Sequence, residues 1–245
     1  MNRFRASLLH FMISAAVGML LLSLVWFVYY PSPLLVGLGG LEIFLLIIFV
    51  DVILGPLLTL VVFDVRKKSL RFDLAAIATL QLVALCYGAT QLFAARPAYI
   101  AALDNELQVI QATEIPDQLL EKTSTSLPLF GPRWVGTVMP TDRLQLEEVT
   151  LVTQMADGGA GHFPQYHSDI SSNTNQLLAV ARAVDELTAI HEIDSSRVDD
   201  WLANQGVSRE DAVFVPAKIQ ADRYAAIVSR RERKIVGITP FMLRQ

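Results

Sequence analysis

Long runs of apolar residues dominate the first part of this sequence, and shorter alternating patterns dominate the rest. Three runs, at residues 8–30, 41–63 and 74–95, each have about the 20 residues that a helix needs to cross a bilayer. The first and third contain no Asp, Glu, Lys or Arg, whereas the second contains Glu42 and Asp51. The pattern predicts three transmembrane helices within a membrane domain of residues 1–95.

The basic residues beside these runs are distributed unevenly. One set of flanks holds Arg3, Arg5, Arg66, Lys67, Lys68 and Arg71. Residues 31–40 carry no charge, and the glycine-rich 37–40 is expected to connect two spans rather than to bind a nucleotide. Arg96 alone follows the third run. The bias predicts a cytoplasmic N-terminus and an exported segment after Arg96. The first run is longer than the roughly 7–15 apolar residues of a signal peptide and lacks a small-residue cleavage site, so we expect a retained anchor.

Composition agrees with a membrane part joined to an exported domain. The 245 residues are 53% hydrophobic and 18% charged, with a mean hydropathy of +0.42. Residues 96–245 are enough for one domain with its own core. They hold 14 Lys and Arg against 20 Asp and Glu, a formal charge of −6, which argues against a nucleic-acid or anionic-lipid surface. The one cysteine, Cys86, lies in the third run, so the exported domain has no disulfide.

The pattern of residues 96–245 predicts an α+β fold. A hairpin is expected over 99–112, with its turn at Asp104-Asn105, followed by a helix that begins near Pro116. A strand is expected over 134–139, and helices over 141–156, 176–190 and 195–204. The segment 157–175 is rich in Gly, Ser and Asn and is expected to be a long loop. Three final strands are expected over 212–219, 223–229 and 234–241.

Candidate chemistry is sparse. His162 and His167 have a spacing that a metal could use, but no third ligand is evident nearby, so we expect solvated histidines and no metal. The carboxylates around the helix at 195–204 are expected to form a solvated face. Glycine-rich phosphate loops and hydrolase or metalloprotease motifs are absent from the sequence. The expectation is a protein that is not an enzyme and carries no cofactor.

Asp51 is the residue that most needs an explanation. An ionised carboxylate at the centre of a bilayer costs on the order of 3 kcal/mol even on the mildest insertion scale. A hydrogen bond to Thr79, Gln81 or Gln91 of the third run could offset this cost, as could a polar group on a partner helix. Gly55 and Pro56 follow one turn later and would loosen the backbone and admit a close neighbour. An internal tie, a docking site for a partner and a proton or ion path all stay open.

Several segments together resemble one known family. They are "YPSPL", "VDVILGPLLTLVVFD", "RKKSLRFDLAAIATLQLVALCYG", "ARPAYI", "LPLFGPRWV" and the "GG…P.Y" loop. In this order they resemble the TfpX/TfpZ type IV pilin accessory proteins across nearly the whole chain. The resemblance is most specific from Asp51 to Pro97. The loop here contains an extra "AGH", at residues 160–162, relative to the family pattern.

The resemblance implies a bacterial inner-membrane protein with a periplasmic α+β domain. Its partners would be the lipid bilayer and the major type IV pilin, and it would support pilin stability, pilus assembly or the balance of extension and retraction. The family brings no catalytic activity or cofactor. An alternative interpretation is a membrane-tethered periplasmic ligand-binding or regulatory subunit.

Two aromatic residues mark a possible contact surface in the exported domain. Trp134 lies in "LPLFGPRWV" and Phe163 lies in the predicted loop 157–175. Each could face a partner, or could fold back as a plug of the core. With Asp51, Gly55 and Pro56 they complete the set of candidate partner-binding residues.

Alkaline phosphatase fusions test the predicted topology. Because the enzyme is active only after export, fusions after Ser32 and after Asn105 should be active. A fusion after Ser69 should be inactive, because the basic flank holds it in the cytoplasm. Activity at Ser69 would contradict the arrangement.

Overall fold

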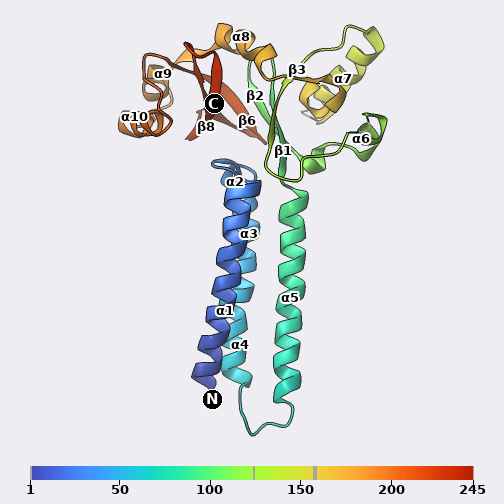
Figure 1. Cartoon of the computed structure of the whole chain (residues 1–245), viewed down its shortest axis with the longest axis vertical. Coiled ribbons are helices and arrows are strands. Elements are labelled where there is room, and N and C mark those ends of the chain that lie inside the picture. Colours follow the sequence, from blue (N-terminus) through green and yellow to red (C-terminus); the bar gives the residue numbers. More distant parts are fainter. Residues whose placement is uncertain (1, 124, 157–158, 245) are drawn as a thin grey trace. The chain divides into compact units, whose positions relative to one another are not determined.

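The computed structural model describes residues 2–123, 125–156 and 159–244 and divides into two compact units. One unit contains the chain up to Pro31 together with Gly39–Ala95. The other contains Ser32–Leu38 and the chain from Arg96 onward. Each unit is described by itself below (Figure 1).

Apolar helices build the first unit. Helix α1 (Arg3–Leu24) continues into a π-helical turn at Val25–Tyr29. The second helix is made of α3 (Gly40–Ile48), a π-helical turn (Phe49–Leu54) and α4 (Gly55–Val62), and the third is α5 (Leu70–Ala94). Within the described residues, three helices of 27, 23 and 25 residues are long and apolar enough to cross a membrane. The three expected apolar helices are confirmed.

Small side chains allow these helices to approach one another closely. A Cβ atom on Gly18 of α1 would lie 2.6 Å from the Cδ1 atom of Ile48, and one on Gly88 of α5 would lie 2.4 Å from Ile47. Close approach matters in a bilayer because lipid tails leave dispersion contacts, rather than the hydrophobic effect, to hold helices together. One turn after Gly88, the buried Tyr30 hydroxyl donates to the Leu92 carbonyl at 2.8 Å.

A mixed sheet forms the centre of the second unit. Its strands are β1 (Pro97–Ala102), β2 (Leu107–Gln111), β3 (Arg133–Thr137), β4 (His167–Ser168), β5 (Arg182–Ala183), β6 (Ala212–Ile219), β7 (Asp222–Ser229) and β8 (Lys234–Met242). In the described residues the order is β4-β3-β1-β2-β6-β7-β8, with β5 paired to β6. The pairs β1–β3 and β2–β6 are parallel, and the other pairs are antiparallel. The predicted α+β class, the hairpin at 99–112 and the three final strands are confirmed.

Helices pack around this sheet. Helices α9 (Asp185–Ala189) and α10 (Ser195–Asn204) bury Leu187 and Leu202 with Phe214 of β6 and Ile227 of β7. Helix α6 (Asp117–Thr123) contributes Leu120 to a cluster with β1 and β2. Helix α7 (Arg143–Ala156) buries Val149 against Phe163.

The connector between the first two apolar helices is part of this second core. Residues 34–37 form the short helix α2 (Leu34–Gly37), and Leu34, Leu35 and Leu38 are buried. Gly37 lies against Ile219 of β6, because a Cβ atom there would be 3.0 Å from the Ile219 Cγ2 atom. The expected connector therefore also contributes core residues to the second unit. Its leucines are uncharged because they are core residues.

The segment from 157 to 190 differs from its prediction. The expected loop contains 3-10 turns at Ala160–His162 and Pro164–Tyr166, strand β4 and the start of α8 (Ser171–Val180). Asp157 and Gly158 lie outside the described residues. The single helix expected over 176–190 is wrong, because Ala181 is extended and the chain pairs with β6 before α9 begins. Strand pairing overrides the helical stripe, and Val180 of that stripe is exposed.

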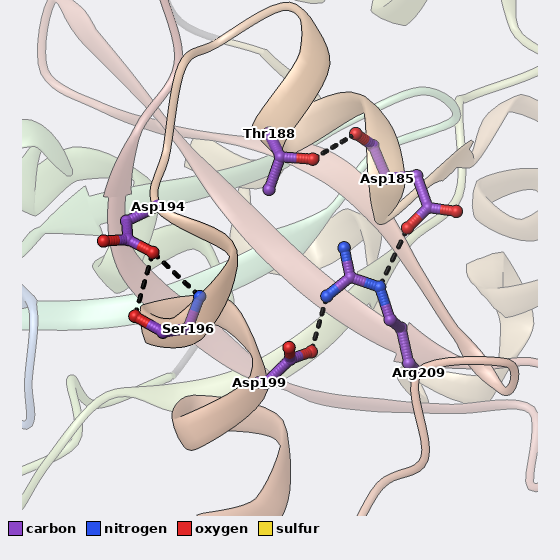
Figure 2. Close-up of polar contacts among 6 residues, drawn as sticks. All are labelled: Asp185, Thr188, Asp194, Ser196, Asp199 and Arg209. Carbon is purple, nitrogen blue, oxygen red and sulfur yellow. Dashed lines mark hydrogen bonds and ion pairs between the residues drawn. The ribbon is translucent and has the colours of Figure 1, made fainter.

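Polar contacts among charged residues join α9, α10 and the turn before β6 (Figure 2). Arg209 donates to Asp185 at 2.8 Å and to Asp199 at 2.5 Å, so one guanidinium bridges both helices. Asp194 caps α10 by accepting from the backbone N–H and the hydroxyl of Ser196. The hydrogen bonds from Ser196 lower the pKa of the Asp194 carboxyl. The face expected to be merely solvated thus orders the helix ends.

The end of β3 is clamped by a side-chain amide of α8. Asn173 accepts from the Thr137 backbone N–H at 2.9 Å and donates to the Thr137 carbonyl at 3.0 Å. Gly136 makes this approach possible, since a Cβ atom there would lie 2.3 Å from the Asp169 carbonyl oxygen and 2.7 Å from the Asn173 Oδ1 atom.

Gly136→Ala should therefore destabilise the protein by about 1–3 kcal/mol, the usual cost of overpacking against atoms that cannot move. The thermal unfolding midpoint of the full chain in detergent measures the effect. Gly237→Ala is the matched control in another strand, because its nearest neighbours are Trp201 ring atoms at 3.7 and 3.8 Å. Equal midpoints for the two variants would contradict the clamp.

Candidate functional site

A polar cluster lies inside the first unit, at the contacts of its helices. It consists of Ser7, His10, Asp51, Thr59 and Gln81. The Ser7 hydroxyl donates to the Pro56 carbonyl at 2.9 Å, and His10 Nδ1 lies 2.7 Å from the Thr59 hydroxyl. These bonds connect α1 with α4. Polar groups of an apolar bundle are thus paired with one another rather than directed outward.

The π-helical turn explains why Gln81 belongs to this cluster. The Gly55 N–H donates to the Val50 carbonyl, five residues back. The next donor in this register is residue 56, a proline, which has no N–H. The Asp51 carbonyl therefore loses its helical partner. Gln81 Nε2 of α5 donates to that carbonyl at 3.0 Å and replaces it.

Gly55 provides the space for this contact. A Cβ atom at Gly55 would lie 2.1 Å from Gln81 Nε2, so any larger residue would displace the amide. Asp51, Gly55 and Pro56 thus form one local arrangement: the proline removes the donor, and the glycine admits the replacement. The internal tie to Gln81 exists, and it includes the backbone carbonyl of Asp51.

The Asp51 carboxyl itself has an incomplete set of partners. The residue is 7% exposed, and its Oδ1 atom is buried without a hydrogen-bond partner in the part of the chain that the structure describes. A buried acceptor without a donor is costly unless something else supplies one. Because this oxygen is enclosed within the helical unit, a polar group from outside the chain would reach it only if the helices around it moved.

A cleft of about 320 Å³ lies in the second unit, beside β3. It is lined by Tyr99, Thr125, Arg133, Trp134, Val135, Pro164, His167, Ser168, Asp169 and Ile170. Apart from Thr125, these residues come from the end of "LPLFGPRWV", from the predicted loop 157–175 and from β1. The two segments that the sequence marked as a possible contact surface are therefore brought together, around one cleft.

Aromatic and charged groups give this cleft its character. The rings of Tyr99 and His167 meet edge to face with centroids 4.5 Å apart. His167 Nε2 lies 2.7 Å from the Gly161 carbonyl, so this nitrogen carries the proton and donates. Burial lowers the pKa of His167, and the nearby Arg133 charge lowers it further, so the imidazole is neutral at pH 7. Burial likewise raises the pKa of Tyr99.

The remaining predicted residues differ in their exposure to solvent. Trp134 is 38% exposed and lines the cleft. Phe163 is 1% exposed and packs with Val149 and Ala160, so of its two possible uses it serves as a core plug. His162 is also buried and accepts from the Gly159 N–H at 3.1 Å, which corrects the expectation of a solvated histidine. In the described part of the chain, no group of three or more His, Cys, Asp or Glu could hold a metal ion.

Sequence reasoning missed Tyr99 and Arg133 as members of the cleft, whereas Gln81 was among the expected partners of Asp51. One signal for Arg133 was available: it is the only charged residue of "LPLFGPRWVGTVMP". Tyr99 carried no such signal, because only the pairing of β1 with β3 brings it beside the cleft.

The fold defines a class of protein with three apolar helices of membrane length and a separate sheet-containing unit. The chain matches no family model and no solved structure. It is 36% identical over 124 residues to two proteins of Dichelobacter nodosus, the fimbrial assembly proteins of serogroup I and serogroup E1. That stretch is 50% of this chain and 47% of each relative, so the chain spans about half the length of these curated relatives.

A shorter relative is covered more completely. The fimbrial assembly protein of serogroups C1 and C2 of the same organism is 36% identical over 116 residues, which are 46% of this chain and 86% of that protein. This chain belongs to the family of these fimbrial assembly proteins.

The contact between Gln81 and the Asp51 carbonyl gives a testable prediction. Gly55→Ala and Gln81→Leu should each destabilise the helical unit by about 1–3 kcal/mol, the cost of a buried acceptor left unpaired. Because both remove the same hydrogen bond, the double variant should cost clearly less than the sum. Thermal unfolding of the full chain in detergent measures all three.

Thr90→Val serves as the control on α5. Its hydroxyl donates only within its own helix, to the Cys86 carbonyl, and the side chain is exposed, so its loss should matter little. Strict additivity of Gly55→Ala and Gln81→Leu would show that the two residues do not share one contact.

Proposed function

We propose that this protein is a bacterial inner-membrane accessory protein of type IV pilus assembly, which binds the major pilin and acts on it in a chaperone-like way. The observation that carries the proposal is the 36% identity to fimbrial assembly proteins, one of them covered over 86% of its length. The motifs shared with the TfpX/TfpZ accessory proteins support the narrower assignment. We propose no enzymatic activity and no cofactor.

The proposed orientation follows the distribution of basic residues. The N-terminus and residues 64–71 would be cytoplasmic, and the sheet-containing unit would be periplasmic. A pilin that docks beside the apolar helices before assembly would present a largely apolar helix whose N-terminus is polar. A protein with three apolar helices of membrane length could meet that helix within the bilayer.

Asp51 is the proposed contact in the membrane. Its Oδ1 atom is an acceptor that the described residues leave unsatisfied. A polar group near the N-terminus of a pilin helix could donate to it. Gln81 Nε2 donates to the Asp51 backbone carbonyl, and this hydrogen bond does not use the Oδ1 atom.

Copurification with the tagged full chain from native membranes tests the function. The eluate should be enriched in the major pilin. A purified protein with a bound small molecule and no pilin would instead favour the alternative, a membrane-tethered ligand-binding or regulatory subunit, for which the cleft of about 320 Å³ offers space.

Asp51→Leu tests the membrane contact. It should insert about 3 kcal/mol more favourably on the translocon scale, so the amount of protein should not fall. Recovered pilin should fall about two- to tenfold, the value of one hydrogen bond, and Asp51→Asn should lower it less. Glu42→Leu, which removes an exposed carboxylate at the other end of the same helix, is the control. If Asp51→Leu protein disappears while the remainder binds pilin normally, Asp51 is only an internal tie.

A further inference from the structure

One edge of the sheet is only partly covered. Strand β4 pairs with β3 at Gly136 and Thr137 alone. The preceding residues of β3, Arg133–Val135, pair with β1 on their inner side and line the cleft on their outer side. Within the described residues no strand covers this outer side. An open strand edge presents backbone donors and acceptors to which an extended segment of another protein can pair.

Unused polar groups surround the same edge. Arg133 forms no ion pair, and the Tyr99 hydroxyl forms no hydrogen bond, with the residues that the structure describes. His167 uses Nε2 for the Gly161 carbonyl, which leaves Nδ1 as an acceptor for a peptide N–H. A guanidinium and a phenol beside one another are suited to a carboxylate, which accepts from both.

A carboxylate is already present in the lining, but it is occupied. Asp169 Oδ1 accepts from the Ser171 backbone N–H at 2.9 Å and from the Ser171 hydroxyl at 2.5 Å. These bonds lower the pKa of the Asp169 carboxyl, so it carries a negative charge. This negative charge repels a second carboxylate from its own part of the cleft. Arg133 is therefore the place where a ligand carboxylate is favoured.

The apolar lining and the size of the cleft limit the kind of ligand. Trp134, Val135, Pro164 and Ile170 offer hydrophobic contacts beside the open edge. A volume of about 320 Å³ holds a few side chains and excludes a folded domain. A short extended segment, with backbone on the edge of β3 and alternate side chains in the cleft, satisfies both constraints.

We propose that the cleft binds an extended segment of the pilin as an added strand along Arg133–Val135, with a carboxylate of that segment held by Arg133 and Tyr99. The choice of pilin as partner rests on the proposed function, whereas the strand and the carboxylate follow from the edge and its polar groups. The protein thereby shields a segment of the pilin that would otherwise be exposed before assembly.

Photocrosslinking in membranes of pilin-producing cells tests the proposal. The photoreactive residue p-benzoyl-phenylalanine replaces Trp134 in the tagged full chain, an aromatic exchange at a half-exposed position of the cleft. In a second strain it replaces Ile190, an exposed residue outside the cleft lining. Pilin should crosslink at position 134 and not at 190. Mass spectrometry of the adduct should place the link in an extended pilin segment with an Asp, a Glu or the C-terminal carboxylate beside it.

Variants of Arg133 test the carboxylate. A hydrogen bond to a charged group is worth about ten- to a hundredfold in affinity, so Arg133→Gln should lower the adduct by that factor. Arg133→Lys should retain more of it, since it keeps the charge and loses only the planar fork. Arg231→Gln, which removes an exposed charge in the turn between β7 and β8, should leave the adduct unchanged. Equal thermal midpoints of these variants show that folding is intact.

The outcomes separate the two proposals. Pilin in the eluate without an adduct at position 134 would overturn the cleft proposal and leave the proposed function standing. Absence of pilin from the eluate and from the adduct at position 134 would overturn the cleft proposal and the proposed function. An adduct that Arg133→Gln does not change would show that Arg133 is merely a charge that keeps the edge from aggregating. A link to a helical pilin segment would overturn the added strand.

Discussion

Every backbone polar group of a helix in hydrocarbon needs a partner, and this constraint organises the second apolar helix. Pro56 has no N–H, and in the register of the π-helical turn this leaves the Asp51 carbonyl without its backbone donor. Gln81 supplies the missing donor, and Gly55 leaves room for it. Asp51 and Gln81 form this hydrogen bond, and Gly55 and Pro56 make it both possible and necessary. The bond joins the second helix to α5, and the bonds of Ser7 and His10 join it to α1.

The sheet-containing unit meets a similar need with a similar device. At the end of β3, Asn173 binds both the N–H and the carbonyl of Thr137, as a neighbouring strand would. Gly136 admits the approach there, as Gly55 does in the helical unit. In both units a side-chain amide replaces a missing backbone partner, and a glycine gives it access. Strand β4 is short, and the edge of β3 before it is left open to the cleft.

The two proposed contacts with pilin would use different chemistry. In the helical unit, the site is a single unsatisfied acceptor in apolar surroundings, suited to a polar group on a helix. In the sheet-containing unit, it is an open strand edge beside the Arg133 guanidinium, which forms no ion pair among the described residues and is suited to an extended acidic segment. A family of fimbrial assembly proteins provides a setting in which a subunit with a membrane helix and a folded domain would present both.

The sequence by itself determined the features that depend on local pattern. Apolar length alone defined the three helices, because a bilayer demands about 20 apolar residues of any helix that crosses it. Alternation and turn residues defined the hairpin at 99–112 and the strands β6, β7 and β8, since these pair with neighbours in sequence. The unusual placement of Asp51, Gly55 and Pro56 was also visible in the sequence. A carboxylate in an apolar helix raises the free energy of insertion, and a proline removes a backbone hydrogen bond.

Only the tertiary structure decided what depends on pairing between distant segments. Residues 176–190 have a helical stripe, yet β6 offers Arg182 and Ala183 a strand partner and breaks the helix. The leucines of 34–38 resemble any uncharged connector until Ile219, far along the chain, is seen beside Gly37. Phe163 could be plug or surface until Val149 covers it. The cleft exists only because β1, β3 and the segment after Phe163 meet, and no local pattern encodes a meeting of segments so far apart.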